Sequence, residues 1–159
     1  MKNEDLFHRV YRENYRKVIS LCLGFVSGDH DEASDLAQEI FIKVWENLGS
    51  FRNEASISTW IYRITVNTCL THIKKKKYLP LTADVVEEES ADVHHIESQF
   101  KAMYRCMDQL SPINKSIILL ELEQVPQQEI AGIIGISHEA LRTRFHRIKS
   151  QLSKCAKNG

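Results

Sequence analysis

The chain has 159 residues, of which 43% are hydrophobic and 26% are charged, which is typical of a soluble globular protein. No apolar run approaches the roughly 20 residues of a membrane-spanning helix, and the N-terminus lacks the apolar core of a signal peptide, so we expect a cytoplasmic protein. The formal net charge is +0, but residues 1–77 carry +2, residues 78–98 carry −6 and residues 99–159 carry +4. The zero total therefore does not exclude nucleic-acid binding.

The cysteine content argues against both a disulfide framework and a cysteine-rich metal site. The four cysteines are far apart and form no CxxC pair: Cys22, Cys69, Cys106 and Cys155. We therefore expect buried, inert thiols in a reducing compartment. The chain has only six glycines and three prolines, and its apolar periodicity is helical nearly throughout, which predicts an all-α fold.

The first two predicted helices span residues 6–26 and 32–48. A break that contains Gly28 separates them, and Asp31 is the expected N-cap of the second helix. Apolar residues recur at every fourth position of the second helix and predict its buried stripe: Leu36, Ile40, Val44 and Leu48. The opposite face carries three polar residues at i, i+3 and i+4 spacing: Asp35, Gln38 and Glu39.

A third helix is predicted from Thr59 to Lys77, after a polar surface loop. Its buried stripe is predicted at three- and four-residue spacing: Ile57, Trp60, Ile61, Ile64 and Thr68. A different face carries hydroxyl, guanidinium, amide and ammonium groups: Thr59, Arg63, Asn67, Thr71 and Lys74. This face either lies along a phosphate backbone and touches base edges, or is the solvated side of an amphipathic helix. The preceding loop, led by Phe51 and Arg52, has residues that could hold an unstacked base.

Residues 78–98 have the composition of a linker, with six acidic residues, no basic residue and little periodicity. The sequence therefore predicts two small all-α domains, residues 1–77 and 99–159, joined by a flexible acidic linker. Within the second domain Ser111 is the expected cap of a helix that Pro112 begins.

The last forty residues have the spacing of a helix-turn-helix. A short helix over residues 127–134 is followed by a tight turn and a last helix from His138. Ala131 lets the two helices approach closely, and Gly135 permits a left-handed turn.

The core positions of the last helix repeat every three or four residues: Leu141, Phe145, Ile148 and Leu152. Four residues are thereby turned outward: Arg142, Thr143, His146 and Arg147. Such a face suits the DNA major groove; the alternative is a helical hairpin in a protein-interaction domain.

Several motifs together resemble a known family. The first half contains DLAQEIF (35–41), FR (51–52) and STWIYRITVN (58–67), and the second half contains LSP (110–112), EIA (129–131), IGI (134–136) and RTRFHR (142–147). These motifs resemble regions 2 and 4 of a bacterial sigma factor of the sigma-70 family. Because only a linker separates the two regions, the layout resembles that of the extracytoplasmic-function (ECF) subfamily. Many members of this subfamily carry Gly-Thr where this chain has Glu139-Ala140, and the difference bears on the promoter sequence.

The resemblance implies a protein that binds RNA polymerase core, directs it to promoters and opens the −10 element. The implied polymerase-binding residues, on the clamp helices of the largest subunit, are Asp35, Gln38 and Glu39. The implied −10 contacts are Phe51, Arg52, Trp60, Arg63 and Asn67, and the implied −35 contacts are Arg142, Thr143, His146 and Arg147. Trp60 has an alternative place in the core, because it is in phase with the apolar stripe. The flap of the second polymerase subunit and an anti-sigma factor, often membrane-bound, are further implied partners.

Two other functions remain to be weighed. A stand-alone helix-turn-helix regulator would leave the polar face of the second helix and the third-helix motif without a role. A carboxylate metalloenzyme would use His30 with the acidic residues that follow it, but no second helix has a matching set of ligands. The sequence contains no catalytic signature and no cofactor motif, so we expect neither an enzyme nor a bound metal or cofactor.

Overall fold

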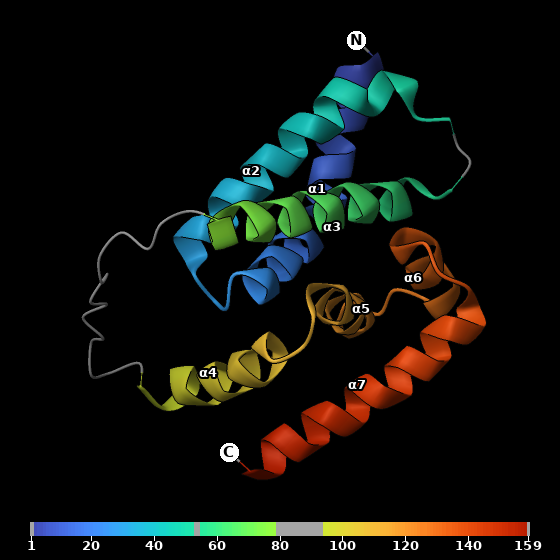
Figure 1. The fold of residues 1–159 in the computed structure, drawn as a ribbon. Coiled ribbons are helices and arrows are strands. Elements are labelled where there is room, and N and C mark those ends of the chain that lie inside the picture. Colours follow the sequence, from blue (N-terminus) through green and yellow to red (C-terminus); the bar gives the residue numbers. More distant parts are fainter. Residues whose placement is uncertain (1, 53–54, 79–93, 159) are drawn as a thin grey trace.

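The computed structural model describes residues 2–52, 55–78 and 94–158, and these residues form helices joined by short connections (Figure 1). The elements are α1 (Lys2–Phe25), α2 (His30–Asn47), the short 3-10 helix η1 (Leu48–Ser50), α3 (Ile57–Tyr78), α4 (His94–Asp108), α5 (Pro112–Leu122), α6 (Gln127–Ile134) and α7 (His138–Asn158). The predicted all-α class is confirmed. None of the helices in the described ranges is both long and apolar enough to cross a membrane.

In the first half of the chain, α1, α2 and α3 pack against one another (Figure 1). The turn between α1 and α2 uses two left-handed residues, Ser27 at φ 56° and Gly28 at φ 85°. Asp29, rather than Asp31, is the N-cap of α2, so that prediction is wrong. Asp29 has extended backbone, and its carboxylate accepts a hydrogen bond from the Glu32 N–H at 3.1 Å, which leaves Asp31 inside the first turn.

Helix α3 begins two residues earlier than predicted because Ser56 caps it. The Ser56 hydroxyl accepts a hydrogen bond from the Thr59 N–H at 3.1 Å and pairs with the Thr59 hydroxyl at 2.8 Å. Thr59 is consequently buried, so its predicted place on the exposed polar face is wrong. The buried stripe is confirmed at Ile61 and at Thr68.

The second half of the chain contains α4 to α7. Ser111 caps α5 by accepting from the Asn114 N–H, and Pro112 is the first residue of that helix, as predicted. Helix α4 begins at His94, so residues 94–98 are helical where the composition predicted linker; residues 79–93 of that predicted linker lie outside the described residues.

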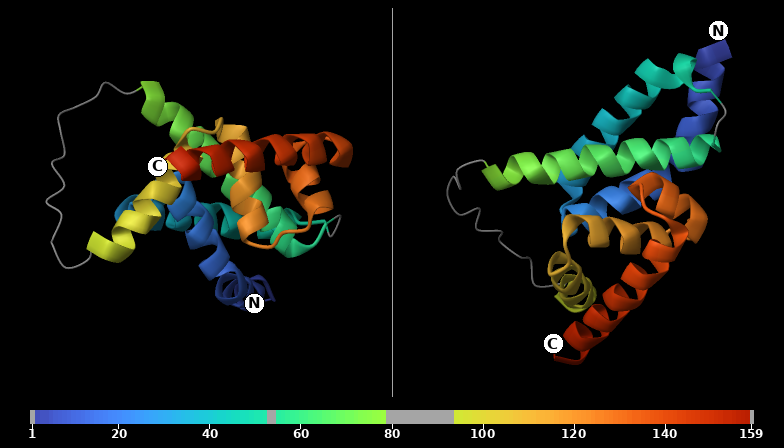
Figure 2. Two further views of the ribbon diagram at one scale, coloured as in Figure 1. Left: turned by 90° about the horizontal axis from the view of Figure 1, so that it is seen from below. Right: turned by 45° about the vertical axis from the view of Figure 1, so that its right-hand side comes forward.

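The two halves pack against each other in this structure: α1 lies on α5, and α3 lies on α6 (Figures 1 and 2). Gly24 of α1 makes this contact close, since a Cβ at that position would stand 2.3 Å from a methyl carbon of Leu119. The buried Lys115 ammonium of α5 also joins the two halves, because it donates to the Phe25 carbonyl of α1 at 3.2 Å. It donates to Asp108 of α4 as well. The buried apolar residues form one cluster from Val10 in α1 to Ile148 in α7.

The cysteines divide into two pairs, which the sequence did not predict. Cys106 of α4 and Cys155 of α7 form a disulfide, so the expectation of inert thiols is wrong for both of them. Their Cα atoms lie 5.7 Å apart although 49 positions separate them in the chain, and this proximity arises from tertiary packing. Cys22 and Cys69 are free and buried, as expected.

Candidate nucleic-acid interface

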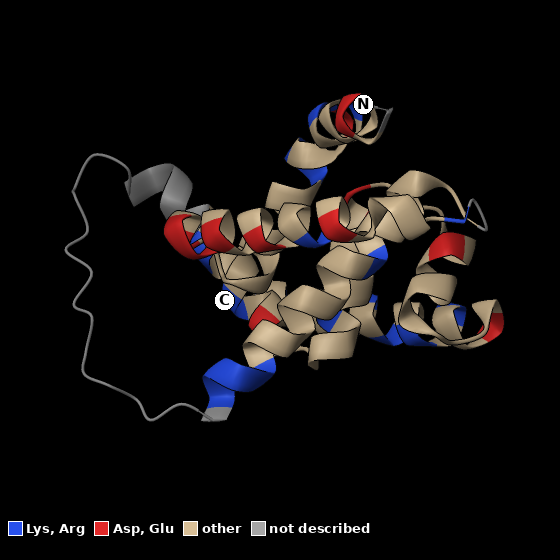
Figure 3. Cartoon of the chain, turned by 90° about the horizontal axis from the view of Figure 1, so that it is seen from above, with Lys and Arg blue, Asp and Glu red and all other residues tan. Residues whose placement is uncertain are grey.

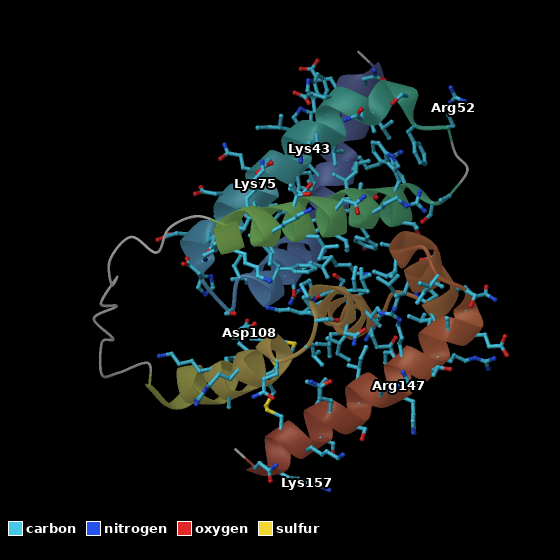
Figure 4. The ribbon with its side chains drawn as sticks, in the orientation of Figure 1. Lys43, Arg52, Lys75, Asp108, Arg147 and Lys157 are labelled. Atoms are coloured by element: carbon cyan, nitrogen blue, oxygen red, sulfur yellow. A yellow bond between two sulfur atoms is a disulfide. The ribbon has the colours of Figure 1, made fainter. Side chains whose placement is uncertain are left out.

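The first candidate surface is the outer face of α7. Its inner face is anchored in the core by Leu141, Phe145 and Ile148. The four residues predicted to point outward are exposed, and together with Glu139 they line one shallow groove: Arg142, Thr143, His146 and Arg147. Figure 4 shows the Arg147 side chain directed away from the body of the molecule. The structure therefore brings the predicted reading residues together on one surface.

The turn that positions α7 has the geometry of a helix-turn-helix. Gly135 ends α6 in the left-handed region at φ 88°, and its N–H donates to the Ala131 carbonyl at 2.8 Å. Ser137 then accepts from the Ala140 N–H at 3.1 Å and caps α7. These two hydrogen bonds fix the direction in which the first turns of α7 leave the body.

The neighbouring cations of α7 have other contacts. Arg144 donates to the side-chain carbonyl of Asn114 at 3.3 Å, beside the groove rather than in it. The Lys149 ammonium lies 4.5 Å from the centre of the Phe145 ring, close enough for a cation–π contact. The basic residues of α7 thus differ in their contacts within the molecule.

Sequence reasoning missed Glu139 as a member of this groove. A carboxylate there repels phosphate, and it can accept a hydrogen bond from the cytosine amino group in the major groove. The signal was available in the sequence, because Glu139 precedes Arg142 and Thr143 by three and four positions and so shares their helix face.

The second candidate surface lies on α3 and the segment before it. The rings of Phe51 and Trp60 are in contact, with centroids 5.1 Å apart and planes at 45°. Trp60 is half-buried and packs on the core. Arg52, Arg63 and Asn67 are exposed, and Arg52 projects from the segment that follows η1 (Figure 4).

Part of this α3 surface is covered by the second half of the chain. The Arg63 guanidinium reaches the Gly132 carbonyl of α6 at 3.5 Å. Tyr62 is buried at the same contact, and its pKa is raised, first by burial and then by the charges of Glu123 and Glu129. Three of the predicted −10 residues, Trp60, Arg63 and Asn67, therefore lie on α3, and Phe51 and Arg52 lie in the segment before it. Arg63 also makes a hydrogen bond within the molecule.

The third candidate surface is the outer face of α2, where Asp35, Gln38 and Glu39 are all exposed, as their spacing predicts. Acidic residues recur along this helix (Figure 3). Glu39 forms an ion pair with Lys43 at 3.4 Å, and both side chains remain about half exposed. The polar face predicted on α2 is thus available to a partner.

A groove that the sequence analysis did not identify borders this face. It has a volume of about 460 Å³ and lies between α1 and α2, with Gln38 among its lining residues. Its lining is largely aromatic, with Phe7, Tyr11, Tyr15, Phe41 and Trp45 among the residues. Trp45 is 47% exposed, which is unusual for a side chain of its size. The four-residue spacing of Phe41 and Trp45 was visible in the sequence, but it gave no indication that α1 adds three further rings.

Among residues 2–52, 55–78 and 94–158 there is no cluster of three or more His, Cys, Asp or Glu side chains that could hold a metal ion. The fold and these surfaces define an all-helical protein with a helix-turn-helix in its second half and further polar faces in its first half.

Comparisons with known proteins identify the family. Residues 10–78 match Sigma-70 region 2, and residues 100–152 match Sigma-70, region 4. The chain is 30% identical to the RNA polymerase sigma-H factor of Pseudomonas aeruginosa, over 96% of this chain and 93% of that protein. Further relatives, from Bacillus subtilis and Mycobacterium tuberculosis, are named ECF RNA polymerase sigma factors.

Two solved structures share the fold. CnrH in complex with the cytosolic domain of CnrY superposes with a TM-score of 0.75 at 17% identity, covering 98% of this chain and 90% of that one. The sigma factor RpoE in complex with the anti-sigma factor NepR, from Bartonella quintana, gives a TM-score of 0.68 at 18% identity, covering 94% and 97%. The chain belongs to the sigma-70 family of RNA polymerase sigma factors, in its ECF subfamily.

Proposed function

We propose that this chain binds RNA polymerase core, directs it to promoters by reading a −35 element with α7, and opens the −10 element with α3. The observation that carries the proposal is the row of exposed groove residues on α7. The opposite side of the same helix is anchored in the core by buried apolar residues. The chain acts by binding, in the cytoplasm, and the nucleotide chemistry belongs to the polymerase.

The −35 contact is assigned to Arg142, Thr143, His146 and Arg147. An arginine that meets a guanine with two hydrogen bonds discriminates against other bases by about 1–3 kcal/mol. The Glu139 carboxylate in the same groove repels phosphate and can accept a hydrogen bond from a cytosine amino group. The groove therefore combines donors and an acceptor, as sequence recognition requires.

The −10 contact is assigned to Phe51, Arg52, Trp60, Arg63 and Asn67. Unstacking a base step costs a few kcal/mol, and aromatic rings offer the extruded base a new stacking surface. The contact between Phe51 and Trp60 supports this role, because it places two rings at the start of α3. Arg63 and Asn67 follow on the same helix, where they can bind phosphate and base edges.

Polymerase docking is assigned to the exposed face of α2. Asp35, Gln38 and Glu39 would meet the clamp helices of the largest subunit, and the aromatic groove beside Gln38 would supply apolar contact area. The second half of the chain would bind the flap of the second subunit. An anti-sigma factor is a further proposed partner, which the complex of RpoE with NepR supports by analogy.

The test compares Arg147→Ala with Arg144→Ala in transcription reactions that contain purified core polymerase and a set of promoters differing only at −35. The two residues share a helix and a charge, but only Arg147 lies in the groove. We expect Arg147→Ala to reduce the preference for the best −35 sequence by about 5- to 150-fold, and Arg144→Ala to leave it nearly unchanged.

An Arg147→Ala variant that lowers transcription equally from every promoter would assign this residue to phosphate and overturn the reading face. A wild-type chain that binds promoter duplex but neither binds core polymerase nor supports initiation would instead favour a stand-alone regulator.

A further inference from the structure

The disulfide between Cys106 and Cys155 lies in a groove between α4 and α7, away from the three surfaces described above (Figure 4). Both cysteines are partly exposed and line the groove, whose volume is about 920 Å³. A small thiol can therefore reach the sulfur atoms from solvent, which thiol–disulfide exchange requires.

The charges around this disulfide favour exchange. Arg105 and Lys154 are the chain neighbours of the two cysteines and line the same groove, and none of the described residues that line it is acidic. Cations beside a cysteine stabilise the thiolate form, which is both the nucleophile and the leaving group in thiol–disulfide exchange. The groove thus favours cleavage as well as formation of the bond.

The second cysteine pair has the opposite environment. Cys22 and Cys69 are fully buried, with sulfur atoms 3.9 Å apart. The pKa of Cys69 is raised, first by its hydrogen bond with Cys22 and then by burial. A protonated, enclosed thiol is a poor nucleophile. The chain therefore contains two partly exposed cysteines and two fully buried ones, and the buried pair serves as an internal control.

We propose that Cys106 and Cys155 form a reversible thiol–disulfide exchange site. Its redox state determines whether α4 is covalently linked to the last turns of α7. A dithiol serves as reductant. Its thiolate attacks one sulfur, the bond between the two cysteines breaks, and the released thiolate takes up a proton. The second thiol of the dithiol then attacks the mixed disulfide, releasing the other cysteine as a thiol and leaving the dithiol oxidised. A disulfide compound reverses both steps.

The contacts of α4 show which parts of the chain the disulfide connects to the end of α7. Tyr104 of α4 packs against Gly28, and Asp108 accepts from Ser27 at 2.6 Å and from Lys115. Helix α4 therefore contacts both the turn after α1 and the start of α5. In the oxidised chain, the disulfide ties the end of α7 covalently to this helix; in the reduced chain only non-covalent contacts remain.

The first experiment equilibrates the native full chain with mixtures of reduced and oxidised dithiothreitol, alkylates the free thiols and locates them by mass spectrometry. We expect Cys106 and Cys155 to become alkylated together as the reductant increases, and to be protected again on return to the oxidised mixture. Cys22 and Cys69 should remain unlabelled until urea is added. Labelling of all four cysteines at one point, or failure to re-form the bond, would overturn the proposal.

The second experiment measures hydrogen exchange in α4 and in the last turns of α7. Reduction should raise the exchange rates there several-fold. Cys155→Ser should exchange at the raised rates in either mixture, whereas the matched variant Cys69→Ala should still respond to the mixture. If oxidised wild-type protein and Cys155→Ser exchange alike in both segments, the disulfide does not fasten α4 to α7 and that part of the proposal fails.

Discussion

At the scale of single residues, Glu32 shows how one side chain joins two helices. Its carboxylate, in the first turn of α2, accepts from His72 at 2.6 Å and from Lys76 at 3.0 and 3.1 Å, both on α3. Burial alone would raise the pKa of Glu32, but these hydrogen bonds and charges outweigh it and hold the pKa below its ordinary value of 4.5. The ionised carboxylate is therefore favoured by folding.

The sign of the pH dependence follows from this lowered pKa. Stability from Glu32 is fully present above pH 4.5 and is lost as the pH falls through the lower pKa of the folded state. We expect Glu32→Gln to reduce the free energy of unfolding at pH 7 by about 1 kcal/mol, because it removes charge-assisted hydrogen bonds. The difference from wild type should shrink as the pH falls below 4.5. Urea unfolding across this pH range measures it.

Glu46→Gln provides the control, since Glu46 is exposed on the same helix. It should change the free energy of unfolding by less than about 0.5 kcal/mol at every pH. A Glu32→Gln deficit that stays constant down to the acid limit would mean that lost packing, rather than lost charge, causes it.

At the scale of secondary-structure elements, the turn between α6 and α7 offers a clean test of backbone strain. A Cβ added at Gly135 or at Gly132 would meet nothing within 4 Å, but only Gly135 has a positive φ. We expect Gly135→Ala to reduce the free energy of unfolding by about 1–2 kcal/mol. Gly132→Ala, inside α6, should raise it by about 0.5–1 kcal/mol. Thermal and urea unfolding of the two variants give the comparison.

The same substitution should also affect DNA binding, because this turn sets the direction of α7. Gly135→Ala should also weaken −35 binding more than Gly132→Ala does. Equal stability of the two variants would show that the turn adjusts without cost, and the left-handed residue would then not be what fixes the angle between the helices.

Several elements of this fold were predictable because local chemistry alone determines them. The bounds of α6 follow from apolar periodicity followed by Gly135, and the start of α5 follows from Ser111 and Pro112. The N-cap of α2 was harder. Asp29 and Asp31 are equivalent in local sequence, and only the left-handed turn at Gly28 places Asp29 at the helix start.

Other features were unpredictable because they depend on which helices meet. The outward row on α7 could be deduced, since its buried stripe lies on the same helix. By contrast, the aromatic groove requires α1 to lie on α2, and the Cys106–Cys155 bond requires α4 to lie on α7. Periodicity places residues on a face of one helix, but it does not say which helix faces that side.

At the scale of the whole molecule, the contact between the two halves has consequences for DNA binding. In this arrangement the exposed Arg63 guanidinium donates to the Gly132 carbonyl at 3.5 Å, so a −10 strand would compete with this hydrogen bond. The apparent affinity of a protein for its ligand falls with the fraction of molecules in the binding-competent state. If the proposed −10 role of Arg63 is correct, weakening the contact between the halves should strengthen −10 binding by the free chain.

Gly24→Leu tests this expectation where α1 packs on α5. A Cβ there would stand 2.3 Å from a Leu119 methyl carbon, whereas leucine is a good helix former and suits the last turn of α1 itself. We expect the variant to keep its helical circular dichroism, to show a larger radius of gyration in X-ray scattering, and to bind a single-stranded −10 oligonucleotide several-fold more tightly.

Gly49→Leu is the matched control, since a Cβ there would meet only the Asn3 side chain at 3.7 Å. An unchanged radius would show that Leu119 repacks around the new side chain. A chain that opens without binding more tightly would show that the hydrogen bond from Arg63 to the Gly132 carbonyl does not limit −10 binding.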